Sequence, residues 1–184
     1  MIKKEARSGG EATSLAEELR YITFNTSAGW IGILASTKGL LSATLPRRSA
    51  QEAYQLLGNS VKSAARSPDL FEQLIACFRA YFNGYKVTFT DKLDVSKATG
   101  FQREVWKITS LIPYGETRSY LWVAEQIKRP KAMRAVGQAL ARNPLPVIIP
   151  CHRVLSINGK LGGYSGGIET KRYLLHLEVS GNTG

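Results

Sequence analysis

The first half of the chain alternates apolar and polar residues as β-strands do. Three short runs show this alternation: residues 21–27, 30–36 and 40–45. The turns between them are short and contain Gly29 and Gly39, and short turns between β-rich runs are typical of antiparallel hairpins. Pro46 ends the pattern, so we predict a small antiparallel sheet.

Helical spacing follows the predicted sheet. Ser49 has the character of an N-cap, so a first helix is expected to begin there. A second helix is expected to be capped by Ser67 or Asp69 and to stop near Gly84. Residues 86–90 then predict a returning strand.

The second half of the chain is patterned mostly as helices. In residues 100–112 the apolar side chains are spaced four, three and four apart, which places them on one helix face. Further helices are expected at 119–127, with Ser119 as the N-cap, and at 131–142 and 169–178. The first two of these are joined by a short turn, and the second is basic and rich in small residues, which outlines a helix-turn-helix. An ordinary αα-hairpin is the alternative interpretation.

The segment between the last two helices is shaped by prolines. Two prolines before residues 147–149 exclude helix, and these three apolar residues predict a short buried segment. The Asn-Gly pair at 158–159 predicts a hairpin turn that joins 154–156 to 160–161. Such a hairpin beside a helix-turn-helix would be a wing.

These patterns predict an α/β protein of two domains. A small α/β domain with an antiparallel sheet would occupy residues 1–90, of which the polar residues 1–17 are expected to be a tail. A polar linker is expected at 91–100. A mostly helical C-terminal domain with the winged helix-turn-helix would occupy 101–184.

The composition is that of an ordinary globular protein. Of the 184 residues, 43% are hydrophobic and 21% are charged, which is usual for soluble domains. No apolar run approaches the roughly 18 residues that a membrane span requires, and no signal peptide follows Met1. We therefore expect a soluble protein without a membrane partner, cytoplasmic or, in a eukaryote, nuclear.

The net charge of +11 is unevenly divided along the chain. Residues 1–95 carry 12 Lys and Arg against 9 Asp and Glu, whereas residues 96–184 carry 13 against 5. An excess concentrated in one half favours a polyanionic partner, most simply nucleic acid. A generally basic, well-solvated surface would give the same excess, so the charge alone does not decide.

Two cysteines and two histidines limit the covalent and metal chemistry of the chain. They form neither a disulfide framework nor a zinc-finger spacing, so we expect no metal. Cys77 lies in a predicted helix and is interpreted as a small buried hydrophobe. Cys151 differs, because Pro150 precedes it and the pair His152 and Arg153 follows it, behind the buried segment.

Cys151 and His152 together suggest a nucleophile with its base. A free thiol is only slightly ionised at neutral pH, and a nearby imidazole raises the thiolate fraction. In a strand the two side chains would point apart, but in a tight turn after Pro150 they could converge. A carboxylate would complete the relay. The candidates that spacing leaves open are Glu116, Glu169 and Glu178. A buried inert thiol beside a structural histidine is the alternative.

Residues 150–154, Pro-Cys-His-Arg-Val, resemble the signature of the O6-alkylguanine-DNA alkyltransferases, the methylated-DNA–protein-cysteine methyltransferases. Further segments follow the pattern of that family in order: Phe101-Gln102, Val105-Trp106, 112–117, Ser119-Tyr120, 134–137, Asn143-Pro144, 163–167, Lys171 and Glu178. The resemblance is dense over residues 80–180 and loose in the first half, where only the segments at 29–32 and 39–40 match.

The resemblance implies an RNase H-like first domain and a winged helix-turn-helix second domain. It also implies direct-reversal DNA repair, in which the alkyl group of O6-alkylguanine in double-stranded DNA moves irreversibly to Cys151, once per molecule and without a cofactor. O4-alkylthymine as a second substrate and self-association along DNA stay open. Some family members hold zinc in the first half, but residues 1–95 here contain one Cys and no His, so we expect none.

The resemblance also implies a role for each site residue. The catalytic set is Cys151, His152, Glu178 and Tyr120. His152, a water and Glu178 would relay the thiol proton, and the Tyr120 hydroxyl would donate to guanine N3. The set that binds DNA or the base is Ser119, Arg134, Ala135, Gly137, Asn143, Val154, Tyr164 and Ser165.

Within the second set, the loop of Tyr164 and Ser165 would meet guanine O6, and the backbone at Cys151 and Val154 would read the exocyclic amine. Arg134 would fill the space left by the flipped base. The small side chains of its helix, Ala135 and Gly137 among them, would let that helix enter the minor groove, and Asn143 would hold the turn of the cysteine.

Three other functions fit parts of the sequence. A lesion sensor of the same fold would lack the cysteine, whereas Cys151 is present here. A winged-helix regulator with a sensor thiol would need an added effector domain. A cysteine hydrolase would turn over repeatedly and would not need the basic helix. We therefore predict alkyl transfer.

Overall fold

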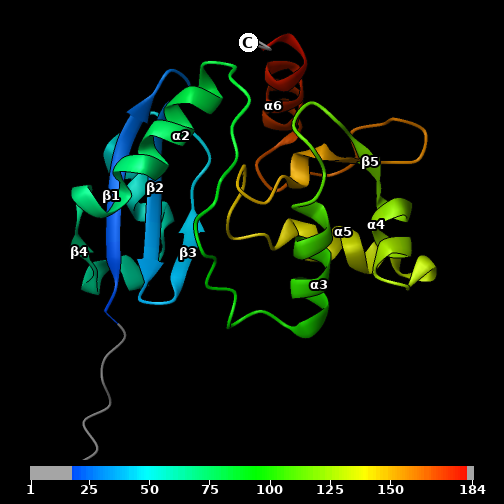
Figure 1. Cartoon of the computed structure of the whole chain (residues 1–184), viewed down its shortest axis with the longest axis horizontal. Helices are drawn as coiled ribbons and strands as arrows, with labels where there is room; N and C mark the ends of the chain where they lie inside the picture. The colour runs from blue at the N-terminus through cyan, green and yellow to red at the C-terminus, as the bar shows by residue number, and fades with distance from the viewer. Residues whose placement is uncertain (1–17, 182–184) are drawn as a thin grey trace, which may run out of the picture.

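The computed structural model describes residues 18–181, so the tail predicted at 1–17 lies outside the described residues. A sheet region forms one side of the molecule and a mostly helical part forms the other (Figure 1). The strands are β1 (Arg20–Thr26), β2 (Gly29–Ser36), β3 (Gly39–Ala43), β4 (Ala65–Arg66), β5 (Arg118–Ser119) and β6 (Val154–Leu155). The helices are α1 (Ala50–Leu56), α2 (Glu72–Phe82), α3 (Gly100–Thr109), α4 (Tyr120–Gln126), α5 (Met133–Ala141) and α6 (Ile168–Ser180).

The three strands predicted in the first half are confirmed and form an antiparallel meander. β4 pairs in parallel with β1, so the strand order is β3-β2-β1-β4. Successive side chains point to opposite faces of a strand. On one face, the Phe24 ring meets Phe78 of α2 with centroids 5.8 Å apart. On the other face, Tyr21 and Leu34 pack beside Tyr54 of α1, so the sheet lies between two helices.

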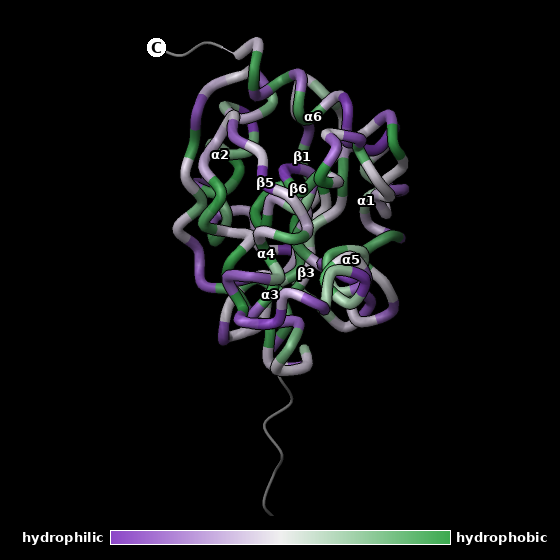
Figure 2. Tube along the Cα trace, turned by 90° about the vertical axis from the view of Figure 1, so that its right-hand side faces the viewer, coloured by the Kyte–Doolittle hydropathy of each residue, from purple (hydrophilic) through white to green (hydrophobic). Residues whose placement is uncertain are grey.

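The helices α3, α4 and α5 pack against one another, and Figure 2 shows them grouped at a distance from α6. Ser119 caps α4 as predicted, because its hydroxyl accepts a hydrogen bond from the Trp122 N–H at 3.0 Å. α5 begins at Met133, two residues later than predicted, because a 3-10 turn at Pro130–Ala132 comes first.

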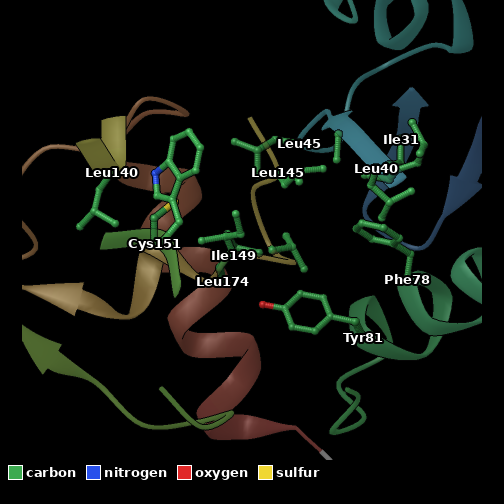
Figure 3. Close-up of a cluster of buried hydrophobic side chains, with 14 of the residues drawn as sticks. Ile31, Leu40, Leu45, Phe78, Tyr81, Leu140, Leu145, Ile149, Cys151 and Leu174 are labelled. Carbon is green, nitrogen blue, oxygen red and sulfur yellow. The ribbon is translucent and has the colours of Figure 1, made fainter. Parts of the chain in front are cut away.

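One hydrophobic core runs through both halves of the chain (Figure 3). It joins Phe78 and Tyr81 of α2 to Ile149, Cys151 and Leu174 of the helical part. Because these side chains come from distant segments, packing fixes the position of the cysteine relative to the sheet.

The polar segment at 91–100 is bound to the edge of the sheet. The Asp94 N–H donates to the Leu40 carbonyl at 2.8 Å, and the buried Asp94 carboxylate accepts from the Ser36 hydroxyl at 2.6 Å. α3 then begins with a capping box at Thr99.

Two predictions in the first half are wrong. Residues 86–90 form no strand, and Phe89 instead packs its ring into the core. Neither Ser67 nor Asp69 caps α2 with its side chain, because a 3-10 turn at Pro68–Phe71, which includes Asp69, comes first and the N-cap position of α2 is Phe71.

The predicted wing hairpin is only partly formed. The Ser156 N–H donates to the Lys160 carbonyl at 2.9 Å and closes the turn, but no second strand follows, and β6 pairs in parallel with β5 instead. Lys171 explains part of this difference. Its buried ammonium group donates to the carbonyls of Val154 and Leu161, which replaces the bonds of a strand ladder.

Candidate active site

Cys151 lies in a tight turn that Asn143 holds in place. The turn Cys151–Arg153 is a single 3-10 turn. The Asn143 side-chain amide donates to the Ile149 carbonyl at 2.8 Å and to Cys151 Sγ at 3.2 Å. Ile149 and Val147 are 1% and 2% exposed, so the predicted buried segment is confirmed. Val147 has a φ of 74°, which a β-branched residue adopts only under strain, and such strain is typical of functional segments.

The thiol of Cys151 is buried, and burial is the largest cause of its raised pKa. The Asn143 amide, the Tyr164 hydroxyl and the Lys171 charge act in the opposite direction. The Tyr164 hydroxyl is buried and does not reach full hydrogen-bond geometry with any group in residues 18–181. At neutral pH the thiol is protonated and needs a base before it can attack.

His152 is fully buried beside Cys151, and its two ring nitrogens have different surroundings. Nε2 lies 2.7 Å from Glu178 Oε1 and 3.3 Å from the Tyr81 hydroxyl, whereas Nδ1 has no partner in the described part of the chain. Because a carboxylate only accepts, the proton belongs on Nε2, which leaves a free lone pair on Nδ1. Burial lowers the pKa of His152, which favours this neutral form.

Glu178 of α6 gathers the groups around His152. Its Oε1 accepts from His152, from the Tyr81 hydroxyl at 2.6 Å and from Arg153 Nη2 at 3.0 Å. Its Oε2 accepts from Arg153 Nε at 2.8 Å and from the Gly115 N–H at 3.1 Å. Burial alone would raise the pKa of this carboxyl, but the bonds from His152 and Arg153 outweigh it and lower the pKa to about 2. We call Tyr81, His152, Arg153 and Glu178 the Glu178 cluster.

Of the three carboxylates that the sequence left open, the described structure brings Glu178 to His152 and leaves the other two on the surface. Glu116 and Glu169 each pair with a neighbouring arginine instead. The packing of α6 against the cysteine turn therefore decides which carboxylate meets His152, and spacing along the chain does not reveal this packing.

Sequence reasoning assigned no role to Arg153 and missed Tyr81 altogether. Tyr81 lies in an aromatic face of α2, where neighbouring phenylalanines serve only packing. The one signal in the sequence was a tyrosine at a position that helical spacing predicts to be buried. A buried hydroxyl needs a hydrogen-bond partner, so a polar group was to be expected near it.

A cavity of about 840 Å³ opens in front of the thiol. Residues predicted for catalysis or for binding DNA or the base line it together: Tyr120, Arg134, Gly137, Cys151, Tyr164 and Ser165. The Tyr120 hydroxyl lies 3.5 Å from the Gly163 carbonyl, and burial raises the pKa of Tyr120. The phenol is therefore protonated at neutral pH and able to donate into the cavity.

The main-chain groups of Val154, predicted to read the base, already have partners in the protein. Its N–H donates to the Cys151 carbonyl, and its carbonyl accepts from Lys171 Nζ at 2.6 Å. Burial lowers the pKa of Lys171 to about 8. A carbonyl oxygen has two lone pairs, so Val154 keeps one for a further donor.

Four of the residues predicted to contact DNA lie on α5 or just before α4. Arg134 and Ala135 are exposed next to each other on α5, and Arg134 lines the cavity. Gly137 faces Tyr120, where an added Cβ would lie 3.8 Å from the ring, an ordinary contact. The Ser119 hydroxyl accepts the capping bond of α4, which leaves its own proton free to donate.

Within residues 18–181, no group of three or more His, Cys, Asp or Glu side chains is placed to hold a metal ion. No helix in that range is long and apolar enough to cross a membrane. Cys77, predicted to be buried, is a free thiol that is partly exposed on α2.

Residues 100–180 match the family model described as 6-O-methylguanine DNA methyltransferase, DNA binding domain. The methylated-DNA–protein-cysteine methyltransferase of Mycobacterium tuberculosis is 50% identical over 113 residues, which cover 61% of this chain and 68% of that protein. The protein of the same name from Methanosarcina mazei is 49% identical over 110 residues, which cover 60% and 69%.

Solved structures resemble the chain over nearly its whole length. The crystal structure of Mycobacterium tuberculosis OGT in complex with DNA has a TM-score of 0.75 and 39% identity, and the match covers 88% of this chain and 93% of that one. The O6-methylguanine-DNA methyltransferase from Pyrococcus kodakaraensis has a TM-score of 0.61 and 26% identity, with 87% and 98% covered. The chain therefore belongs to the family of methylated-DNA–protein-cysteine methyltransferases.

Proposed function

We propose that the protein repairs DNA by direct reversal, taking the alkyl group of an O6-alkylguanine onto Cys151 irreversibly and once per molecule. The observation that carries this proposal is the position of Cys151, which lines a cavity and is followed directly in the chain by His152, the residue that bonds to Glu178. The names of the relatives, methyltransferases that act between methylated DNA and a protein cysteine, support it. A thiolate attacks an alkyl carbon directly, so the reaction needs no cofactor.

The Glu178 cluster would act as the base. Among the described residues no hydrogen bond joins Cys151 to His152, so a water between Sγ and the free Nδ1 would pass the thiol proton to the imidazole. Glu178, ionised above a pKa of about 2, would stabilise the imidazolium that forms. The bond from Sγ to the alkyl carbon forms as the bond from that carbon to O6 breaks, and the electron pair leaves on the guanine.

The departing guanine is anionic and has to meet donors. The Tyr120 hydroxyl would donate to N3, and the loop of Tyr164 and Ser165 would meet O6. The remaining lone pair of the Val154 carbonyl would accept from the exocyclic amine. These contacts strengthen as negative charge develops, so they stabilise the transition state more than the bound substrate.

The base has to leave the duplex to reach a buried thiol, which costs a few kcal/mol. We infer that α4 and α5 form a helix-turn-helix, with β6 and the turn after it as a reduced wing. Arg134, exposed at the mouth of the cavity, would fill the space left in the stack. The small residues Ala135 and Gly137 would let α5 approach the minor groove, and the Ser119 hydroxyl would donate to a phosphate.

The finer fold assignments belong to the same proposal. We infer an RNase H-like first domain at residues 1–90, a linker at 91–100 and a DNA-binding, catalytic domain at 101–184. The mixed sheet with a helix on each face supports the first assignment.

Duplex DNA with labelled O6-methylguanine tests the function. One label per protein molecule should move to Cys151 and stay there through repeated additions of DNA. Cys151→Ala should take up no label yet bind the same duplex with a Kd within about twofold, because the small substitution leaves the cavity lining in place. Repeated turnover, or label on another residue, would exclude the proposed function.

A further inference from the structure

Tyr81 connects the N-terminal half of the chain to the Glu178 cluster. It lies on α2 and is 1% exposed. Its hydroxyl donates to Glu178 Oε1 at 2.6 Å, the same oxygen to which the His152 Nε2–H donates at 2.7 Å. Figure 3 shows the ring reaching from α2 toward the helical part, with its oxygen at the leading end.

The ring of Tyr81 and its hydroxyl serve different purposes. The ring packs edge-on against Phe82 and Tyr114, with centroids 5.1 Å and 6.0 Å apart, and a phenylalanine would make the same contacts. A hydroxyl in a core is unfavourable unless it is hydrogen-bonded. Both polar groups near this hydroxyl, Glu178 Oε1 and His152 Nε2, belong to the cluster, so packing alone does not account for the oxygen.

The charges around the hydroxyl fix its role as a donor. Tyr81 faces Glu178, Arg153 and Tyr114, and His152 faces Glu178, Arg153 and Lys171. Burial, and then the charge of Glu178, raise the pKa of Tyr81 well above its ordinary value, although Arg153 opposes this. The phenol therefore keeps its proton throughout the pH range in which a thiol is assayed.

We propose that Tyr81 is a positioning residue for thiol activation: its hydroxyl holds Glu178 Oε1 against the Nε2–H of His152 and so keeps Nδ1 as the base for Cys151. This inference rests on the proposed function. Only the thiol proton moves in the step, from Sγ through a water to Nδ1, while the protons on Nε2 and on Tyr81 stay in place. The N-terminal half thereby contributes to a reaction whose other groups all come from the helical part.

Tyr81→Phe removes the hydroxyl and keeps the ring. Tyr114→Phe is the matched control, because its hydroxyl donates to the backbone carbonyl of Gly84 at 3.1 Å and does not touch the carboxylate. Single-turnover transfer from O6-methylguanine duplex would be measured from pH 6 to pH 9.5 for both variants and the unmutated protein. The Kd for the same duplex would be measured beside it.

Tyr81→Phe should be roughly tenfold slower at pH 7, a part of the effect usual for a general base. The deficit should shrink as the pH rises, because hydroxide then ionises the thiol without the relay. Tyr114→Phe should follow the unmutated profile, and both variants should bind DNA with unchanged Kd. A merely structural role would lower the rate by the same factor at every pH.

An unchanged rate at pH 7, or a deficit independent of pH, would overturn the role of Tyr81. Should Tyr81→Phe fail to fold, nitrogen-15 NMR of the unmutated protein decides. A neutral His152 protonated on Nε2 supports the arrangement, and a proton on Nδ1 overturns it. Absence of label transfer by the unmutated protein would instead contradict the proposed function itself, so the two failures are distinguishable.

Discussion

The Glu178 cluster and the cavity in front of Cys151 are built in opposite ways. Glu178 and His152 are 4% and 0% exposed, and the carboxylate accepts five hydrogen bonds. Arg134, at the mouth of the cavity, is exposed and forms no hydrogen bond or ion pair within residues 18–181. In the first region the carboxylate has its partners within the protein and, among the described side chains, His152 Nδ1 alone stays without one, whereas the cavity presents groups whose partners have to come with the DNA.

Because of this difference, we expect substitutions in the two regions to change stability and activity in different proportions. A buried charge is tolerated only when its hydrogen bonds are satisfied, so removing a member of the Glu178 cluster affects both folding and reaction. An exposed side chain without partners contributes little to folding. Substitutions on the two sides of Cys151 should therefore differ in how far stability and activity fall together.

Glu178→Gln should have the largest effect on stability. Arg153 would lose its counter-charge in a site where water does not replace it, and the amide would put donors where the carboxylate only accepted. Breaking a buried pair in this way costs about 3–5 kcal/mol of unfolding free energy, which urea unfolding measures. Glu169→Gln on the exposed side of α6 is the control and should change stability by less than about 0.5 kcal/mol. Equal losses of unfolding free energy in Glu178→Gln and Glu169→Gln would contradict the stabilising role of the buried carboxylate.

The unmutated protein and Glu178→Gln should also differ in how their stability depends on pH. The folded pKa of Glu178, about 2, lies below its ordinary value of 4.5. The stability from this shift is therefore fully present above pH 4.5 and is lost as the pH falls toward 2. The unmutated protein should lose on the order of 3 kcal/mol more than Glu178→Gln between pH 5 and pH 2.

Arg134→Ala should show the opposite behaviour, with loss of activity and intact stability. Transfer from duplex DNA should fall roughly tenfold, because base flipping would lose the side chain that we propose fills the stack. Transfer from a free O6-alkylguanine base should change little, since no stack has to be opened. Arg142→Ala removes the same charge from the end of α5, outside the cavity, and controls for the general attraction of DNA. Equal losses on duplex and free base would remove the role assigned to Arg134.

The sequence predicted the elements whose signals are local. Alternation gave the three strands of the meander, and the short side chains of Ser49 and Ser119 marked the starts of two helices. The wing hairpin was predicted to be longer than it is. The turn signal at Gly159 is local, whereas the hydrogen bonds of Lys171 to Val154 and Leu161 join segments that are distant in the sequence. The strand expected at 86–90 was wrong for a similar reason, since Phe89 finds its place only in the assembled core.

The site residues also divide into those with a local sequence signal and those that only the tertiary fold brings to the site. Cys151 and His152 were visible as neighbours in a proline-bounded turn, and the family pattern pointed to Glu178. Spacing alone left three carboxylates open, because the choice depends on how α6 packs against the turn. Tyr81 lay beyond both kinds of reasoning, since α2 reaches the cluster only through the tertiary fold.

Ser119→Ala should have the smallest effect, and it tests the boundary between the two regions. Loss of the capping bond to the Trp122 N–H should lower the unfolding free energy by about 1 kcal/mol. Ser49→Ala removes the equivalent cap from α1, away from the cavity, and should cost about as much. If the free proton of the Ser119 hydroxyl donates to a phosphate, the Kd for duplex DNA should weaken in Ser119→Ala and stay unchanged in Ser49→Ala. Equal Kd values in the two variants would reduce Ser119 to a cap, and would place the DNA-facing surface on α5 rather than at the start of α4.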